Sequence, residues 1–305
     1  MHAASHAIGA APPAPDSISA CIVVRNEEAV IDRCLHSLAS VVDEIILVHD
    51  GECEDRTLEI AERYGARVFV QPLVGHAEVA TVFAYEQARS EWILSIDADE
   101  FLSEALRSEL RALVADDQLN GYELLWRMWD GTRYITENGP FKLSLFRRSR
   151  VHVLGTIHAS EQVDPPVRRL ALQLEHQPLY NKYALRSVLT KQRRWARINA
   201  REFIGELDAL PSFNWQGPVR WHPRRRILNR LSPLLFLPYV PVVFVMSFVR
   251  ERGYYGLREN ARMALSQAIY AGLVQFYVAK YLYRGVDGDD LRAAAEPPRP
   301  SALGD

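Results

Sequence analysis

The sequence predicts an α/β protein with a doubly wound, mostly parallel sheet, followed by a helical region that associates with a membrane. Two observations support this prediction. Short apolar, β-branched segments alternate with helical patterns over residues 17–115. Later in the chain, 231–249 is a stretch of nineteen residues without a charge, and an amphipathic pattern follows at 264–283.

Composition narrows the class of protein. With 305 residues, of which 48% are hydrophobic and 24% are charged, the chain is expected to be globular. Its formal net charge of -2 argues against nucleic acid as the main partner. Cys21, Cys34 and Cys53 form no Cys-x-x-Cys pair, so we expect neither a disulfide framework nor a zinc site, and a reducing cytosol fits best.

Strands and helices alternate through the first part of the chain. Strands are expected at 18–24, 44–49, 67–70 and 92–96, and helices at about 30–38, 55–64, 79–89 and 103–114. Gly65 is expected to end the second helix as a C-terminal cap. This alternation predicts parallel strands joined by right-handed crossovers. Because no Gly-x-Gly-x-x-Gly follows the first strand, a dinucleotide-binding dehydrogenase is not indicated.

Polar loops follow the first two strands, at the sheet edge where open α/β folds bind ligands. Arg25, Asn26 and Glu27 follow the first strand, and Asp50 and Asp55 follow the second. Asp55 stands three residues before the first apolar residue of a helix, so starting that helix is an equally good interpretation. For Asp50 the structural alternative is a plain turn.

The strand at 92–96 ends in three carboxylates within four residues, namely Asp97, Asp99 and Glu100. Alternate residues of an extended chain share a direction, so Asp97 and Asp99 are expected to converge on one divalent cation that also binds substrate phosphates. A turn at Asp97 and a helix cap at Asp99 are the alternative.

Three segments, in order and spacing, resemble the nucleotide-sugar motifs of family 2 glycosyltransferases with the GT-A fold. They are Ala20-Cys21-Ile22-Val23-Val24-Arg25-Asn26-Glu27-Glu28, Val48-His49-Asp50-Gly51-Glu52-Cys53-Glu54-Asp55-Arg56-Thr57 and Ile96-Asp97-Ala98-Asp99-Glu100. The second has one residue more than the common Asp-Gly-Ser-x-Asp form, which leaves open which acid touches the base. The downstream half is similar to the bacterial subgroup that builds lipopolysaccharide cores and related surface glycans.

The resemblance implies a nucleotide-sugar donor and a metal cofactor. Asp50 would contact the nucleoside base or ribose, Asp97 would lie near ribose or diphosphate, and Asp99 would ligate Mg²⁺ or Mn²⁺ with Asp97 beside it. The other residues of the expected donor site are Arg25, Asn26, Glu27 and Asp55.

The part of the chain after residue 115 carries the expected acceptor half. Strands are expected at 121–129 and 141–147, with a turn-rich acceptor-side loop at 134–140 between them. His176 matches a recurrent histidine of the family, or it satisfies a buried loop.

An inverting transfer needs one general base that deprotonates the acceptor hydroxyl. Glu161 and His158 are the candidates, and Glu137 and Asp130 are held in reserve. The structural alternative is an ordinary hydrogen-bonded His158 and a Glu161 on the surface of a strand.

A long basic helix is expected at 182–207. Its Gln192-Arg193-Arg194-Trp195 is one residue too short for the Gln-x-x-Arg-Trp signature of processive synthases, so that assignment is rejected. The basic face is expected to be solvated, to neutralise a diphosphate or to touch anionic lipid.

The apolar segment at 231–249 is long enough to span a bilayer, but Pro233, Pro238 and Pro241 interrupt it and basic residues flank it on both sides. We therefore expect a re-entrant or interfacial hairpin with the amphipathic helix at 264–283, at the cytoplasmic face of the cell membrane. A hairpin buried against the rest of a soluble protein is the alternative.

These observations predict an inverting, metal-assisted hexosyltransferase that moves a sugar from a nucleotide-diphosphate donor to a lipid-linked or cell-envelope glycan acceptor. The alternatives are a sugar-nucleotide nucleotidyltransferase, whose Gly-rich basic loop is missing after the first strand, and a non-catalytic membrane-bound sugar-binding protein. The expected organisation is a disordered tail at 1–16, a GT-A catalytic domain at 17–180 with a nucleotide-sugar half at 17–115 and an acceptor half at 116–180, a helical region at 181–290 and a disordered tail at 291–305.

Overall fold

The structure is a computed structural model that describes residues 14–156, 161–179, 185–205, 211–215, 232–250, 254 and 256–288. Both predicted tails lie almost wholly outside these residues. The strands are β1 (Ile18–Val24), β2 (Glu44–Asp50), β3 (Arg67–Gln71), β4 (Trp92–Ser95), β5 (Glu100–Leu102), β6 (Gly121–Trp126), β7 (Phe141–Arg147), β8 (Val151–Leu154), β9 (Gln162–Val163), β10 (Val167–His176) and β11 (Ser212–Phe213). The helices are α1 (Ile31–Leu38), α2 (Thr57–Arg63), α3 (Ala77–Gln87), α4 (Glu104–Val114), α5 (Leu185–Ile204), α7 (Ser232–Arg250) and α8 (Leu257–Arg284).

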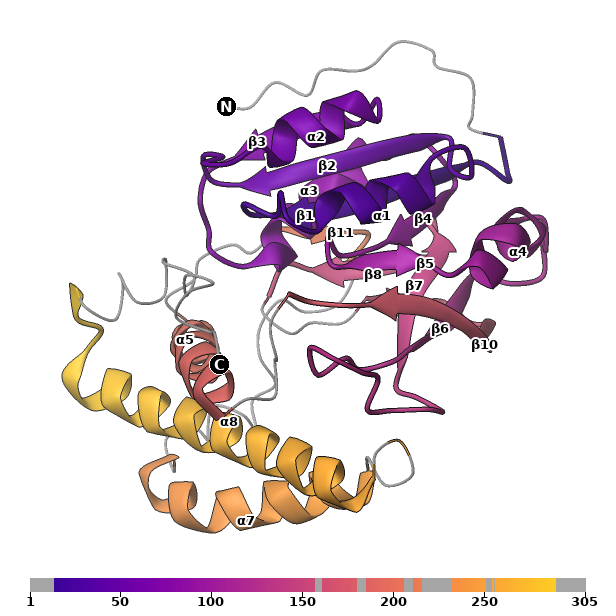
Figure 1. Ribbon diagram of the computed structural model, residues 1–305. Helices are drawn as coiled ribbons and strands as arrows, with labels where there is room; N and C mark the ends of the chain where they lie inside the picture. Colours follow the sequence, from indigo (N-terminus) through magenta and orange to yellow (C-terminus); the bar gives the residue numbers. More distant parts are fainter. Residues whose placement is uncertain are drawn as a thin grey trace.

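The large sheet has the strand order β3-β2-β1-β4-β7-β6-β10-β5 (Figure 1). Its first half confirms the predicted alternation, because β1 pairs in parallel with β2 and β4, and β2 pairs in parallel with β3. Gly65 follows α2 with a φ of 72°, as expected of a C-terminal glycine cap.

The second half of the sheet corrects the prediction of a mostly parallel arrangement. β7 is antiparallel to β4 and to β6, and β5 is antiparallel to β10, so that β10 with β6 is the one parallel pair beyond β4 in the large sheet as described. Parallel neighbours need a long crossover, usually a helix, and the described chain has no helix between β6 and β7. The sheet is therefore mixed.

Apolar side chains cover both faces of the sheet. On one face Ile22 and Trp92 join Leu35 of α1 and Leu106 of α4 in a buried cluster. On the other face a second buried cluster contains Tyr85 of α3 and residues of the small sheet, whose order is β11-β8-β9. Burial on both faces explains the near-continuous apolar runs of the central strands.

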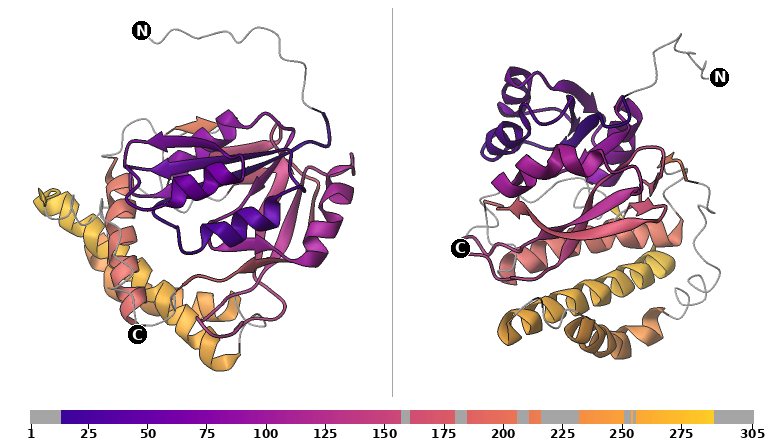
Figure 2. Two further views of the ribbon diagram at one scale, coloured as in Figure 1. Left: turned by 45° about the horizontal axis from the view of Figure 1, so that its top comes forward. Right: turned by 90° about the vertical axis from the view of Figure 1, so that its right-hand side faces the viewer.

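Three helices form a separate layer beside the sheet. Figure 2 shows α8 lying between α5 and α7. Ala196 and Ala200 of α5 pack against Val274, Tyr277 and Tyr281 of α8, and most of these side chains are buried. This contact holds the helical layer together on the side that faces the sheet domain.

Helix α7 differs from the expected broken segment. It is continuous from Ser232 to Arg250 with Pro238 and Pro241 inside it, so the missing amide hydrogens do not end the helix. Among the residues that the structure describes, no helix is long and apolar enough to cross a membrane.

Candidate functional site

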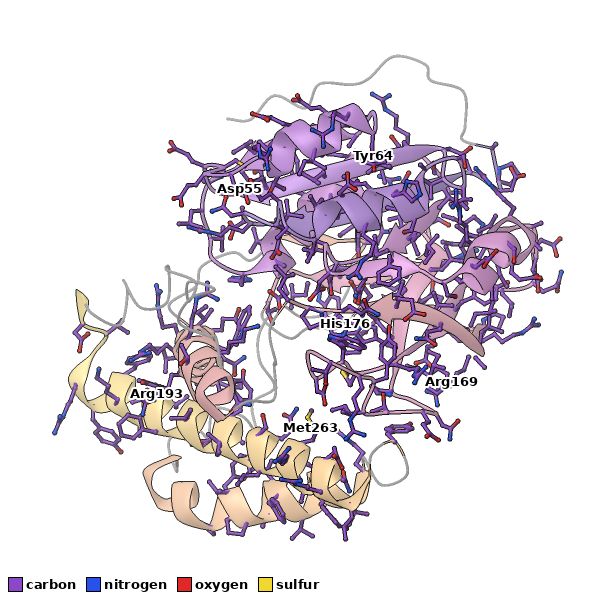
Figure 3. The ribbon with its side chains drawn as sticks, in the orientation of Figure 1. Asp55, Tyr64, Arg169, His176, Arg193 and Met263 are labelled. Carbon is purple, nitrogen blue, oxygen red and sulfur yellow. The ribbon has the colours of Figure 1, made fainter. Side chains whose placement is uncertain are left out.

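The carboxyl ends of β1, β2 and β4 lie side by side, because β1 pairs in parallel with both of the other strands. The polar segments that follow these strands therefore meet at one edge of the sheet, as predicted. Figure 3 shows Asp55 and His176 on the sheet domain and Arg193 on the neighbouring helical layer.

A buried histidine fixes the first two loops to each other. His49 Nδ1 lies 2.9 Å from the carbonyl oxygen of Gly51, and its Nε2 lies 3.2 Å from the backbone nitrogen of Asn26. Because an amide nitrogen donates and a carbonyl accepts, these two contacts fit the tautomer whose proton is on Nδ1. Asn26 has a φ of 52°, and its side-chain oxygen accepts a hydrogen bond from the backbone of Glu54 at 2.9 Å.

Asp55 adds a second connection between these loops. Its carboxylate accepts hydrogen bonds from the backbone nitrogens of Glu28 at 3.1 Å and Thr57 at 2.9 Å. Partial burial on its own raises the pKa of Asp55, but hydrogen bonds from Thr57 and Glu28 hold it below its ordinary value. The N-cap of α2 is Arg56 and not Asp55, but the Asp55 carboxylate accepts from the backbone nitrogen of Thr57, the first residue of that helix. Donor binding by Asp55 stays a prediction.

Asp50 supports the segment that follows β3. One carboxylate oxygen accepts a hydrogen bond from the backbone nitrogen of Val74 at 2.7 Å, and the other accepts from Gly75 at 2.8 Å. Only 5% of Asp50 is exposed. Each oxygen has a remaining lone pair, so the predicted contact with a base or ribose is compatible with this role.

Two guanidinium groups with buried nitrogen atoms lie at the same edge. Arg194 of α5 donates to the carbonyl oxygen of Gly75 through Nη2, and only 7% of Arg194 is exposed. No hydrogen-bond acceptor among the described residues meets Arg194 Nε or Arg25 Nη1, although both atoms are buried. Burial and the nearby charge of Arg25 lower the pKa of Arg194, and Asp50 acts in the opposite direction. Two neighbouring cations with unused buried donors fit an oxygen-rich anionic ligand.

Lys142 of β7 occupies the space next to the carboxylates that follow β4. Its Nζ lies 3.0 Å from Asp97 Oδ2 and 2.8 Å from both carboxylate oxygens of Glu100, which is fully buried. Burial alone lowers the pKa of Lys142, but the charges of Asp97 and Glu100 raise it above its ordinary value. Lys142 is therefore a cation held by two carboxylates.

Asp99 points to a different partner from Asp97. Its Oδ2 lies 3.5 Å from His176 Nε2, and the His176 ring lies against Trp126 with ring centroids 4.6 Å apart. Lys191 of α5 is close enough to Asp99 to be affected by its charge. Burial lowers the pKa of Lys191 to about 8, and the charge of Asp99 acts in the opposite direction. Asp99 thus faces α5 and the end of β10.

Of the carboxylates after β4, Asp99 could bind a divalent cation, whereas Asp97 is already paired with Lys142. Within the described part of the chain, no three His, Cys, Asp or Glu side chains converge as a metal site. Mg²⁺ needs only one or two protein carboxylates when substrate phosphates and water complete its shell, and the side chain of Asp99 is 20% exposed. Asp99 fits that requirement, while Asp97 is engaged by Lys142. The two-carboxylate arrangement expected from the sequence stays a prediction.

One of the two candidate bases can be described. Glu161 Oε1 accepts a hydrogen bond from the hydroxyl of Tyr85 at 2.8 Å, and the same hydroxyl lies 2.8 Å from Ser95 Oγ. Burial raises the pKa of Tyr85 well above its ordinary value, so this hydroxyl keeps its proton. Ser95 is two residues before Asp97, so Glu161 lies near the acidic turn. His158 lies outside the described residues.

A known protein family matches the part of the chain that forms this edge of the sheet. Residues 19–158 match the family described as glycosyl transferase family 2. These residues are a family 2 glycosyltransferase domain. The family 2 domain includes the loops after β1, β2 and β4, and the resemblance found in the sequence is confirmed there.

Relatives of the family 2 domain cover part of the chain. An uncharacterized glycosyltransferase of Rickettsia bellii is 41% identical over 105 residues, which are 34% of this chain and 35% of that protein. The lipopolysaccharide core biosynthesis glycosyltransferase LpsC of Rhizobium meliloti is 35% identical over 142 residues, or 44% of this chain and 52% of that protein. The chain thus spans about a third to about half the length of these relatives. The structure of S. aureus TarS 1–349 in complex with UDP-GlcNAc is 14% identical with a TM-score of 0.43, covering 88% of this chain and 92% of that one.

Several charged residues of this edge were not among those predicted. The sequence around Lys142 did not indicate a role in the site, because Lys142 lies within a strand pattern far along the chain from Asp97. Lys191 and Arg194 belong to the basic helix, which the sequence connected to a diphosphate only as one of three possibilities. The side chains of Lys191 and Arg194 reach the family 2 domain only because of the way α5 packs against it, which the sequence does not reveal.

Proposed function

We propose that this protein transfers a sugar from a nucleotide-diphosphate donor to a glycan of the cell envelope. The buried donors of Arg25 and Arg194 beside Asp50 are the observation that carries the donor side of this proposal. A nucleotide diphosphate supplies the oxygen acceptors that these groups lack. The name of LpsC supports an envelope glycan, including a lipid-linked one, as the acceptor.

The proposed reaction is an inverting displacement at the anomeric carbon. Glu161 takes the proton of the acceptor hydroxyl while the oxygen of that hydroxyl forms a bond to the anomeric carbon. The bond between the anomeric carbon and the diphosphate oxygen breaks at the same time, and its electron pair stays on the diphosphate. A bound Mg²⁺ or Mn²⁺ would supply charge stabilisation to that leaving group, and Asp99 would hold it. Lys191 and Arg194 provide further positive charge at this edge of the family 2 domain.

Replacement of the buried Arg194 tests the donor site. Arg194→Met keeps much of the side-chain volume but removes the charge, so we expect about tenfold to a hundredfold weaker donor binding from the loss of charge-assisted hydrogen bonds. Calorimetric titration of the full chain with UDP-, GDP- and CDP-sugars in the presence of Mn²⁺ measures this change. Arg193→Met is the matched control, because Arg193 is exposed on the same helix. Equal affinities for the two variants would remove Arg194 from the donor site.

We further propose that α7 attaches the protein to the cytoplasmic face of the cell membrane. Five large apolar side chains of α7 are 41–66% exposed, and their spacing places them on one side of the helix. They are Tyr239, Val242, Val245, Met246 and Val249. Basic residues flank this stripe in the sequence, before 231 and after 249, and such residues favour an anionic lipid surface.

The exposed stripe of α7 predicts binding to lipid vesicles. The double variant Val245→Ser and Met246→Ser should bind vesicles of anionic phospholipid about tenfold more weakly, because it removes apolar area that would otherwise enter the lipid interface. Sedimentation with such vesicles measures the binding. Val70→Ser with Val167→Ser is the control, because these valines are 50% and 37% exposed on the sheet domain. If the wild-type chain remains in the supernatant at low salt, the membrane proposal fails.

A further inference from the structure

A pocket lies where the sheet domain meets the helical layer. Its volume is about 400 Å³, and it is lined by the loop between β6 and β7 and by the connection from α7 to α8. Figure 1 shows this loop reaching toward the end of the hairpin at which α7 meets α8. Pockets of a few hundred Å³ accommodate small ligands, so one or two sugar rings are of suitable size.

The loop side of the pocket is held in one conformation by its own hydrogen bonds. Met128 donates from its backbone nitrogen to Thr136 Oγ1 at 2.8 Å, and Ile135 donates to the carbonyl oxygen of Met128 at 2.8 Å. Thr136 is almost fully buried, and its carbonyl oxygen accepts from Arg127 Nε at 3.0 Å. Such a wall is pre-formed, which lowers the entropy cost of binding.

The hairpin side approaches this loop very closely. A Cβ atom built on Gly139 would lie 2.5 Å from the ring of Tyr254, so only glycine fits between the loop and that ring. Arg133 Nη2 lies 3.8 Å from Glu259 Oε1 at the start of α8. The pocket is therefore shared by both parts of the protein.

Tyr134 connects the pocket to the acidic edge of the family 2 domain. Its hydroxyl accepts a hydrogen bond from Gln177 Nε2 at 2.9 Å, and it also contacts Glu175. The backbone nitrogen of Gln177 in turn donates to the carbonyl oxygen of Asp99 at 2.9 Å. Two residues, Tyr134 and Gln177, would thus separate a ligand in the pocket from Asp99.

The side chains that line the pocket favour the glycan acceptor over the nucleotide-diphosphate donor. Glu137 and Glu259 give two negative charges against one positive charge from Arg133, which disfavours a diphosphate. Carboxylates accept hydrogen bonds from hydroxyl groups, Arg133 and Asn138 donate to hydroxyl oxygens, and the rings of Tyr134 and Tyr254 offer flat apolar surface. This combination suits an uncharged, hydroxyl-rich molecule.

We propose that this pocket binds the sugar of the glycan acceptor, so that Tyr254 and Gly256, between α7 and α8, and Glu259 of α8 are part of the acceptor site. The inference rests on the proposed transferase function. It would place the acceptor sugar next to the helix that carries the exposed apolar stripe, which suits an acceptor attached to lipid, with Tyr134 and Gln177 between the sugar and Asp99.

Two binding measurements on the full chain separate this inference from the proposed function. Saturation-transfer NMR with methyl glycosides of glucose, galactose, mannose and N-acetylglucosamine, in the presence of Mn²⁺ and UDP, GDP or CDP, reports the pocket. Calorimetric titration with the same three nucleotides reports the donor site. We expect at least one glycoside to bind, and Tyr254→Ala and Glu137→Gln each to weaken it by about tenfold while nucleotide affinity is unchanged.

Tyr283→Ala is the matched control, because Tyr283 is 72% exposed near the end of α8 and outside the pocket. Glu137 is also exposed, so Glu137→Gln keeps the test decisive if Tyr254→Ala does not fold. Nucleotide binding without any glycoside binding would overturn the pocket assignment alone, as would glycoside binding that folded pocket variants leave unchanged. Failure of both nucleotides and glycosides to bind the wild-type chain would overturn the proposed function together with it.

Discussion

If the proposed function is right, Asp99→Asn is expected to lower sugar transfer by about a thousandfold or more, because a neutral amide is a poor ligand for the divalent cation proposed to stabilise the leaving diphosphate. The fold should survive, since the carbonyl oxygen of Asp99 still accepts from Gln177 and the amide has nearly the same shape. Transfer of radiolabelled sugar from the donor gives the activity, and urea unfolding gives the stability.

The control for this substitution is an acid away from the site. Asp117→Asn changes an exposed carboxylate in the turn after α4, and it should leave transfer unchanged. Metal dependence provides a second readout, because the Asp99 variant should no longer show stronger nucleotide binding when Mn²⁺ is added. Wild-type activity in Asp99→Asn would remove Asp99 as the metal ligand.

Glu161→Gln should reduce transfer by roughly a hundredfold or more while donor affinity stays at the wild-type level. The glutamine oxygen can still accept the hydrogen bond from Tyr85, so the local packing is retained while the ability to take a proton is lost. Single-turnover transfer and nucleotide titration on the same preparation separate these two quantities.

Glu109→Gln, on the exposed side of α4, is the matched control for Glu161→Gln and should transfer at the wild-type rate. Near-normal transfer by Glu161→Gln would move the assignment to His158 or Glu137.

Local sequence patterns predicted the donor edge of the sheet well. The apolar runs that became β1 and β4 are followed at once by Arg25 and Asp97, and Asp50 is the last residue of β2, so parallel pairing brings these three positions to one edge. This worked because the periodicity of strands and helices is a short-range property, and the direction of a parallel strand then fixes where its loop lies.

The same patterns were less informative where one residue had two possible uses. Asp55 could cap a helix or bind a ligand, but the N-cap of α2 is Arg56, and the Asp55 carboxylate instead joins the loop after β1 to the first residue of α2. Asp97 and Asp99, one residue apart, were expected to act together on a cation, which stays a prediction, and the sequence did not indicate that Asp97 pairs with Lys142 while Asp99 faces His176. The partners come from β7 and β10, whose antiparallel placement relative to β4 and β5 no local pattern specified.

The sequence by itself determined the α/β alternation of the family 2 domain, its acidic strand ends and an uncharged apolar segment after a basic helix, but not that this segment is one continuous helix. Only the tertiary structure decided that the domain's sheet is mixed, that Arg194 of α5 reaches Gly75, and that Tyr254 closes a pocket against Gly139. The reason is physical. Strand and helix formation depends on neighbouring residues, whereas contacts between segments more than a hundred residues apart depend on packing of the whole chain.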